Sequence, residues 1–104
     1  MDKTPLARRL KQVRIEKNIS QKKLGLMAHI EECSASARMN QYETGKHSPN
    51  YSSLKKIAEV LEVPPAYFYA EDDNLAELIR LYQSLDKTQA EEALEHLKKK
   101  YVIS

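Results

Sequence analysis

The sequence predicts an all-α protein, in which four or five short helices form a core and a helical hairpin is appended at the carboxyl end. Its 104 residues include only two glycines and four prolines, and residues with high helix propensity are abundant. Apolar residues recur three or four positions apart through most of the chain, which is the spacing of one helix face. Residues typical of helix ends separate these segments. A chain of this length has room for a single modest core.

The first expected helix starts at Pro5, which suits the first turn of a helix, with Thr4 as its cap. Its apolar face consists of Leu6, Leu10 and Val13. Asn18 suits the left-handed conformation that ends many helices. Ser20 is a candidate N-cap for a second helix. That helix runs through Leu24, Met27 and Ala28.

The third expected helix spans roughly residues 35–43, and Gly45 just beyond it suits a C-terminal stop. Its inward side consists of Ala35, Met39 and Tyr42. Asn50 is a candidate cap for a fourth helix. The buried face of that helix consists of Leu54, Ile57, Ala58 and Leu61.

The fourth helix is expected to end near Val63, because a residue before proline is disfavoured in the helical conformation. Pro65 can restart a short turn. The aromatic residues that follow, Tyr67, Phe68 and Tyr69, are expected to close the end of the core.

Two further amphipathic segments are expected to form the hairpin. Their apolar stripes consist of Leu75, Leu78, Ile79, Tyr82 and Leu85 in the first, and of Ala90, Leu94, Leu97 and Tyr101 in the second. Asp86 and Gln89 match a capping box at the start of the second segment. Three lysines near its end suit a helix C-terminus, where the helix dipole favours cations.

Charge is distributed unevenly between the two halves of the chain. Residues 1–56 carry twelve Lys/Arg and five Asp/Glu, a net +7, whereas residues 57–104 carry five and ten, a net −5. A basic front half attracts polyanions such as nucleic acid, and an acidic rear half repels them. Ordinary scatter of solvated charge is the alternative interpretation, since a sum does not locate a patch.

Several function classes find no support in the residues. No apolar run approaches the roughly 18 residues of a membrane helix, and the amino terminus lacks the apolar stretch of a secretory signal, so we expect a cytoplasmic protein without a membrane partner. His29, Cys33 and His47 are too few for a zinc site, and a single cysteine forms no internal disulfide. No nucleophile arrangement or nucleotide-binding glycine loop is present. We therefore expect no catalysis, no metal and no cofactor.

The stretch "CSASARMNQYETG", residues 33–45, combines many hydrogen-bonding side chains with a thin apolar seam. Together with "SQKKL", "QYETGKHSPN" and "LKKIAEVLEV", it resembles the helix-turn-helix family of lambda repressor and Cro, also called the Xre family. The resemblance covers about residues 6–63. It implies a compact lambda-repressor-like DNA-binding domain that places its third helix in the major groove.

The matching positions imply which residues of the third helix read bases. Ser36, Ala37 and Gln41 match base-edge readers. Arg38 lies beside them and can donate two hydrogen bonds to a guanine. Asn40 adds a further donor and acceptor on the polar face. Ala37 can contact only a thymine methyl group.

Phosphate contacts are expected at helix starts and in flanking loops. Gln21 matches a family position that touches a phosphate, with Lys22 close by. Lys46 and His47 match a second loop that grips the DNA backbone. A solvated surface charge is the alternative for each lysine.

Arg14 and Glu43 match an arginine and a glutamate that pair in the family. If they pair in partial burial, the loss of one partner strands the other charge and costs about 3 kcal/mol or more. Two exposed charges that contribute little are the alternative.

The chain departs from the family pattern between its second and third helices. The interval from Gln21 to Glu43 is about four residues longer than usual, so "HIEECSAS" is expected to lengthen the turn. Ser34 and Ser36 are both candidates for the cap of the third helix, and the base-reading positions shift by one or two residues with that choice. Ser34 is therefore also an expected DNA contact. Gly25 replaces the customary alanine, which allows closer packing at some loss of helix stability.

These observations predict a sequence-specific bacterial or phage transcription regulator that binds double-stranded DNA and represses by occluding a promoter. Residues 1–69 form its helix-turn-helix DNA-binding domain and residues 70–104 its hairpin, a candidate dimerisation element. Regulators of this kind bind as homodimers on half-sites about 34 Å apart. Simple capping of the core is the alternative role for the hairpin. The alternative function is a protein-interaction module, such as an antitoxin or adaptor, that holds a protein partner through the hairpin while DNA binding is secondary.

Overall fold

The computed structural model describes residues 4–102, which form six α-helices, one 3₁₀ helix and no strand. The elements are α1 (Leu6–Glu16), α2 (Gln21–Met27), α3 (Glu32–Thr44), α4 (Tyr51–Leu61), the 3₁₀ helix η1 (Pro65–Tyr69), α5 (Asp73–Ser84) and α6 (Lys87–Tyr101). The all-α prediction is confirmed. The outer ends of the predicted domains, residues 1–3 and 103–104, lie outside the described residues.

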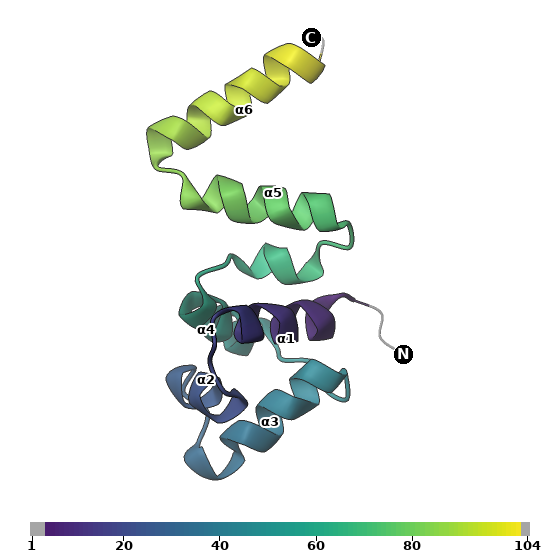
Figure 1. Cartoon of the computed structure of the whole chain (residues 1–104), viewed down its shortest axis with the longest axis vertical. Helices are drawn as coiled ribbons and strands as arrows, with labels where there is room; N and C mark the ends of the chain where they lie inside the picture. Colours follow the sequence, from purple (N-terminus) through teal and green to yellow (C-terminus); the bar gives the residue numbers. More distant parts are fainter. Residues whose placement is uncertain (1–3, 103–104) are drawn as a thin grey trace.

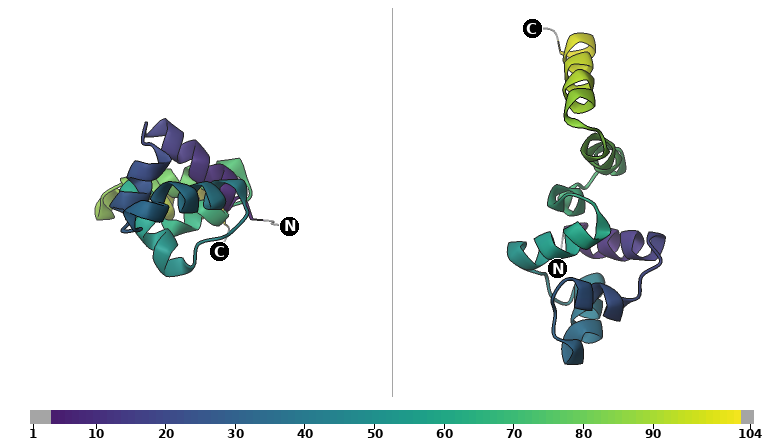
Figure 2. Two further views of the ribbon diagram at one scale, coloured as in Figure 1. Left: turned by 90° about the horizontal axis from the view of Figure 1, so that it is seen from below. Right: turned by 90° about the vertical axis from the view of Figure 1, so that its left-hand side faces the viewer.

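The helices are stacked along one long axis, with extents of 53 × 30 × 23 Å. In Figure 1, α2 and α3 lie at one end and α6 at the other, with α1, α4, η1 and α5 between them. Figure 2 shows the same order after a quarter turn. The third helix and the last helix are therefore separated by most of the length of the molecule.

The core lies between the first four helices and η1. Its largest fully buried side chains are Phe68, Leu10, Leu24, Met39, Leu54, Ile57, Leu61 and Val13. They include most of the inward positions that the helical spacing indicated. Helix α5 adds Ala76 to this core, whereas α6 buries none of its residues.

Capping interactions set the helix ends at the expected places. The Ser20 side chain accepts a hydrogen bond from the Lys23 N–H at 3.0 Å, and Asn50 Oδ1 accepts one from the Ser53 N–H at 2.8 Å. Asn18 adopts the left-handed conformation with φ 59°. These groups satisfy backbone donors and acceptors that a helix end leaves unpaired.

Two further helix ends match the predictions, and one differs slightly. Gly45 has φ 81° just beyond α3, and Asp86 forms a reciprocal capping box at the start of α6. Pro5 precedes α1 instead of lying in its first turn, and Thr4 Oγ1 accepts a hydrogen bond from the Leu6 N–H at 3.3 Å.

The aromatic segment closes the core with two of its three residues. Tyr67 and Phe68 are buried, but Tyr69 is 46% exposed. A 3₁₀ helix turns by about 120° per residue, so three consecutive side chains cannot all face one core. The expectation for Tyr69 is wrong for this reason.

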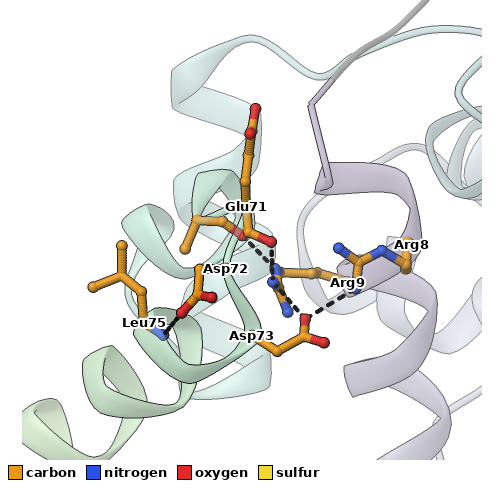
Figure 3. A network of polar contacts seen from close by, with 7 residues as sticks. Arg8, Arg9, Glu71, Asp72, Asp73 and Leu75 are labelled. Carbon is orange, nitrogen blue, oxygen red and sulfur yellow. Dashed lines mark hydrogen bonds and ion pairs between the residues drawn. The ribbon is translucent and has the colours of Figure 1, made fainter.

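Arg9 joins α1 to the chain that leads into α5 (Figure 3). Its side chain is 3% exposed, its Nε donates to the Ala70 carbonyl at 2.8 Å, and its Nη2 donates to Asp73 Oδ1 at 2.9 Å. Hydrogen bonds from Arg9 and then Arg8 lower the pKa of the Asp73 carboxyl group. The buried guanidinium is thus paired, as burial of a charge requires.

Arg80 forms a second tie between α5 and α1. Its Nη2 donates to Glu16 Oε2 at 2.7 Å, and its guanidinium lies 5.5 Å from the centre of the Tyr67 ring. The hydrogen bond from Arg80 lowers the pKa of Glu16, and the same bond raises the pKa of Arg80. Together with Arg9, this pair holds α5 against α1.

The two expected carboxyl-terminal helices are present as α5 and α6, joined by Leu85 and Asp86. Both linking residues are extended, with ψ 152° and 174°, and α6 turns away from α5 (Figure 1). The hairpin is therefore open, and its two apolar stripes do not close on each other along their length.

Candidate nucleic-acid interface

Helix α3 has one buried and one exposed side. Its buried residues are Ala35, Met39, Tyr42 and Glu43. Because successive residues turn by about 100°, the opposite side consists of Cys33, Ala37, Asn40, Gln41 and Thr44. The predicted base readers Ser36, Ala37, Arg38 and Asn40 are exposed, and Gln41 is half-buried.

The start of α3 differs from the expectation, because the helix begins at Glu32 instead of Ala35. The preceding helix ends with His29 in the left-handed conformation, φ 71°, and the Ile30 N–H donates to the Gly25 carbonyl at 2.9 Å. This hydrogen bond is typical of a Schellman ending. The connection between the helices is short, so the prediction of a lengthened turn is wrong.

The additional residues extend α3 instead. Four residues make about 1.1 turns of helix, so their insertion leaves the buried side of the helix almost in register. Neither Ser34 nor Ser36 is the cap: the N-cap residue is Glu31, and Ser34 Oγ donates to the Glu31 carbonyl at 3.4 Å. Glu32 in the first turn is favoured by the helix dipole.

The added turn places Cys33 on the exposed side of α3 and Glu32 beside Lys22 at the start of α2, and both residues are exposed. Neither residue is among the predicted contacts, because the sequence predicts a helix that starts three residues later. The excess of four residues over the usual spacing was the signal that could have located them, since it is close to one helical turn.

Gly25 allows α2 and α3 to approach closely. A Cβ atom at this position would lie 2.9 Å from both the Cβ atom and the carbonyl oxygen of Ala35. Both distances are shorter than van der Waals contact, so the close approach of α2 and α3 requires a glycine here. This agrees with the closer packing expected from a glycine in place of the customary alanine.

A polar network fixes α3 to α1 and α2. Arg14 Nε donates to Glu43 Oε2 at 2.5 Å and Arg14 Nη2 donates to Glu43 Oε1 at 3.1 Å. The two side chains are 13% and 2% exposed. Gln21 Nε2 donates to Glu43 Oε1 at 3.0 Å and to Asn40 Oδ1 at 3.2 Å. The ion pair therefore lies in partial burial and orients two residues expected at the interface, Gln21 and Asn40.

Arg38 occupies a different flank of α3 from Ala37 and Gln41. It lines a pocket of about 220 Å³ between α3, α4 and the turn that follows α2. The pocket is also lined by Lys56, Ser34, His29 and the acidic Glu31. Within residues 4–102, neither Arg38 nor Lys56 forms an ion pair. Two unpaired cations at one concavity suit a phosphate group as well as a base edge.

The residues expected to contact phosphates form two groups. Gln21 and Lys22 lie at the start of α2, where Lys22 Nζ is 3.7 Å from Glu32 Oε2. Lys46 and His47 lie just beyond the end of α3, and both are exposed. The His47 N–H donates to the Gln41 carbonyl at 3.2 Å, which holds this turn against the helix.

Residues 4–102 contain neither a candidate membrane span nor a candidate metal-binding cluster. No helix there has the length and apolar character needed to cross a membrane. No three His, Cys, Asp or Glu side chains between residues 4 and 102 gather as metal ligands would.

Comparison with known proteins gives a family and a structural neighbour. A family model described as a helix-turn-helix domain matches residues 7–74. The crystal structure of transcriptional regulator BswR is similar, with 46% sequence identity and a TM-score of 0.83 over 90% of this chain and 93% of that chain. No curated protein matches the chain.

Proposed function

The chain belongs to the helix-turn-helix family of DNA-binding transcriptional regulators, and from this premise we propose that it is a repressor that binds paired half-sites as a homodimer. Half-sites of such dimers lie about 34 Å, or a multiple of this distance, apart. Occupied sites within a promoter exclude the polymerase, which is the simplest action for a regulator of this size.

The observation that carries the proposal is the placement of α3. The helix lies at one tip of the molecule with its apolar residues buried and its polar flank exposed. The network around Glu43 fixes its orientation before DNA arrives. A rigid polar flank at a tip is what entry into a major groove requires.

We assign base reading to Ser36, Ala37 and Gln41, with Asn40 beside them. The lysines at both ends of the helix pair supply phosphate contacts, because cations there border the groove-entering helix. Arg38 is proposed to donate to a guanine, and its pocket with Lys56 makes a phosphate contact the alternative that mutation can decide.

A binding experiment tests these roles. Duplexes selected from a random pool are titrated by fluorescence anisotropy at several salt concentrations, and the affinity should fall by several log units per tenfold rise in salt. Lys46→Ala removes one phosphate contact from each copy and should flatten the slope by about 0.9 per copy bound, or about 1.8 for the dimer, whatever the sequence. Arg38→Ala should relax one base position in each half-site. Lys99→Ala, in α6, is the matched control and should change neither the salt slope nor the base preference.

The outcomes test the role of Arg38 separately from DNA binding by this surface. If Arg38→Ala behaves like Lys46→Ala, Arg38 contacts a phosphate and the assignment to a base is wrong. If no duplex binds with salt dependence, the DNA-binding role of this surface is wrong. Transcription in vitro from a promoter that contains the selected site should fall as the protein is added, and a rise would contradict repression.

The exposed stripe of α6 favours a second candidate, the protein-interaction module. An adaptor would form a stable complex with a protein partner through this helix and bind duplexes weakly. Wild-type binding to selected duplexes in the absence of any partner would argue against it.

A further inference from the structure

The pocket beside Arg38 is small and rich in hydrogen-bonding groups. Its volume is about 220 Å³, which is below the roughly 300 Å³ at which pockets for drug-sized ligands begin. Polar side chains from both α3 and α4 line it, namely Ser34, Arg38, Tyr42, Ser53 and Lys56. A pocket of this size and lining suits one small polar group and not an extended apolar ligand.

Two cations from different helices line the pocket without partners. Arg38 belongs to α3 and Lys56 to α4. Within residues 4–102 neither forms an ion pair or a side-chain hydrogen bond. Two like charges at one concavity repel each other, so a bound anion gains attraction to both and screens their repulsion. A guanidinium fork and an ammonium group are the donors that bind phosphate in many proteins.

The starts of two helices border the same pocket. Ser34 lies in the first turn of α3, and Ser53 lies in the first turn of α4. The amino-terminal end of a helix carries about half a positive charge, and anions bind there. The Ser53 N–H already donates to Asn50 Oδ1, so α4 contributes through its dipole and its hydroxyl group. These two helix ends add to the positive potential of Arg38 and Lys56.

Tyr42 lines the pocket and carries a hydroxyl group that has no partner. The residue is 6% exposed, and its ring belongs to the core. Its hydroxyl forms no hydrogen bond within residues 4–102, where no fully buried side-chain oxygen or nitrogen lacks a partner. The hydroxyl is therefore not sealed in the core and opens to the pocket. Phenylalanine would fill the core equally well, so packing does not account for this hydroxyl, whereas a polar ligand in the pocket does.

One acidic group opposes an anion at this place. Glu31, the N-cap residue of α3, also lines the pocket. Arg38 and Lys56 contribute a charge of +2 and Glu31 a charge of −1, so a net +1 remains, and protonation of His29 adds one more. The Glu31 carboxylate therefore lowers the affinity for an anion without reversing the sign of the potential.

We propose that this pocket binds a phosphate group. Arg38 and Lys56 donate charge-assisted hydrogen bonds to its oxygens from α3 and α4, and the Tyr42 hydroxyl donates a third. The oxygens of a phosphate are arranged tetrahedrally and accept from donors on several sides, whereas the two oxygens of a carboxylate lie in one plane. The group belongs either to the backbone of a bound duplex or to a small phosphate ester, and these two sources give different experimental results.

A small phosphate ester in the pocket would regulate DNA binding. A phosphate that holds the Arg38 guanidinium withdraws it from the guanine that it is proposed to contact. Coupling between two ligands is reciprocal, so a duplex would weaken phosphate binding by the same factor. This consequence rests on the proposed function, whereas the pocket is assigned from the residues that line it.

Titration of the full chain with inorganic phosphate in the absence of DNA tests the pocket. Two-dimensional NMR at pH 7 and constant ionic strength follows the amide signals of Ser34 and Ser53, and sodium acetate is the comparison anion. We expect saturable shifts and an affinity for phosphate at least about fivefold higher than for acetate. The absence of saturable shifts, or equal affinities for the two anions, would overturn the proposal.

Charge substitutions locate the binding. Lys56→Gln should weaken phosphate binding about tenfold or more, because it removes a charge-assisted hydrogen bond. Lys55→Gln is the matched control: this neighbouring lysine of α4 lines a different concavity, and its loss should change the affinity less than about twofold. Glu31→Gln should tighten binding, since it removes a repulsion. Equal weakening by the two lysine substitutions would place the anion outside the pocket.

Tyr42→Phe separates ligand binding from packing. It should weaken phosphate binding about threefold through the loss of one hydrogen bond. The midpoint of urea denaturation should stay unchanged, because the ring is kept and the hydroxyl has no partner to lose. Unchanged phosphate binding in this variant would contradict the proposed site.

Duplex binding distinguishes the two sources of phosphate. If a backbone phosphate fills the pocket, Lys56→Gln weakens binding to the selected duplex, and an uncharged methylphosphonate at that one position abolishes the difference from wild type. If a small ester fills it, Lys56→Gln binds duplexes like wild type while its affinity for inorganic phosphate still falls. Loss of phosphate binding with intact DNA binding concerns this pocket, and loss of DNA binding with intact phosphate binding concerns the proposed function.

Discussion

Helices α3 and α6 occupy opposite ends of the molecule, and they differ in which side is left uncovered. Helix α3 buries three apolar residues and Glu43 and leaves a polar flank exposed. Helix α6 buries nothing and leaves an apolar stripe exposed. A helix whose apolar side is already covered presents groups for a polar ligand, whereas an uncovered apolar side requires an apolar partner. The two ends of the molecule therefore suit partners of different polarity.

Helix α3 presents its polar flank only while it is held rigidly. Among single substitutions, loss of its ion pair with Arg14 of α1 should lower the free energy of unfolding most. Glu43→Ala should strand the Arg14 charge and lower the free energy of unfolding by about 3 kcal/mol or more, because Glu43 is almost fully buried. Chemical denaturation monitored by circular dichroism measures this loss. Lys22→Ala removes an exposed pair and is the control, with an expected change below about 0.5 kcal/mol. Equal effects of the two substitutions would show that α3 is not held by this pair.

A smaller effect is expected at the contact between α2 and α3. Gly25→Ala introduces a Cβ atom 2.9 Å from Ala35, and overpacking of this kind costs about 1–3 kcal/mol. The gain in helix propensity offsets about 1 kcal/mol, so we expect a net loss of at most about 2 kcal/mol. Urea denaturation measures it.

A second substitution at this contact separates packing from propensity. Ala35→Gly in the Gly25→Ala background removes the contact between Cβ atoms but leaves the contact with the carbonyl oxygen. Relative to Ala35→Gly alone, the cost of Gly25→Ala should therefore shrink without vanishing. A Gly25→Ala protein more stable than wild type would show that the helices have room to separate.

The fold of the α3 end could be read from the sequence because its signals are local. Helical spacing located Met39 and Tyr42, and Ser20 and Asn50 marked helix starts through their own side chains. The start of α3 lies three residues before the predicted one. The sequence did not locate it because the four additional residues are compatible with a longer turn as well as with a longer helix. The choice depends on how α2 ends at His29, and histidine marks a left-handed helix end less strongly than the usual glycine does.

The sequence predicts that the α6 end is a helix, but it does not predict what the apolar side of this helix contacts. Its stripe of Ala90, Leu94 and Leu97 is the same whether the helix folds back on α5 or binds another chain, so the spacing leaves the partner open. Asp86 is extended because it is the N-cap of α6. Leu85 is also extended, and a leucine does not dictate this conformation, so the direction in which α6 leaves α5 could not be predicted. Likewise, the sequence position of Arg38 predicts a base contact, and only the structure shows that Arg38 also lines a concavity with Lys56.

The smallest predicted effect concerns the joint that carries the α6 end on α1. The pKa of Asp73 lies below its ordinary value of 3.8 because Arg9 and then Arg8 donate to it, and the pKa of Glu16 lies below 4.5 because Arg80 donates to it. A carboxyl group with a lowered folded-state pKa contributes stability above its unfolded pKa and loses it as the pH falls through the folded value. The joint should therefore be intact at neutral pH and weaken below about pH 4, with little loss of global stability because Asp73 is exposed.

Carboxyl NMR titration measures both midpoints. Arg80→Gln should return the Glu16 midpoint toward 4.5 and leave that of Asp73 unchanged, because the two ties share no carboxyl group. An Asp73 midpoint at or above 3.8 would mean that Arg9 does not hold α5 in solution. The pair of Arg80 with Glu16 and the burial of Ala76 would then be left to hold α5 on the core.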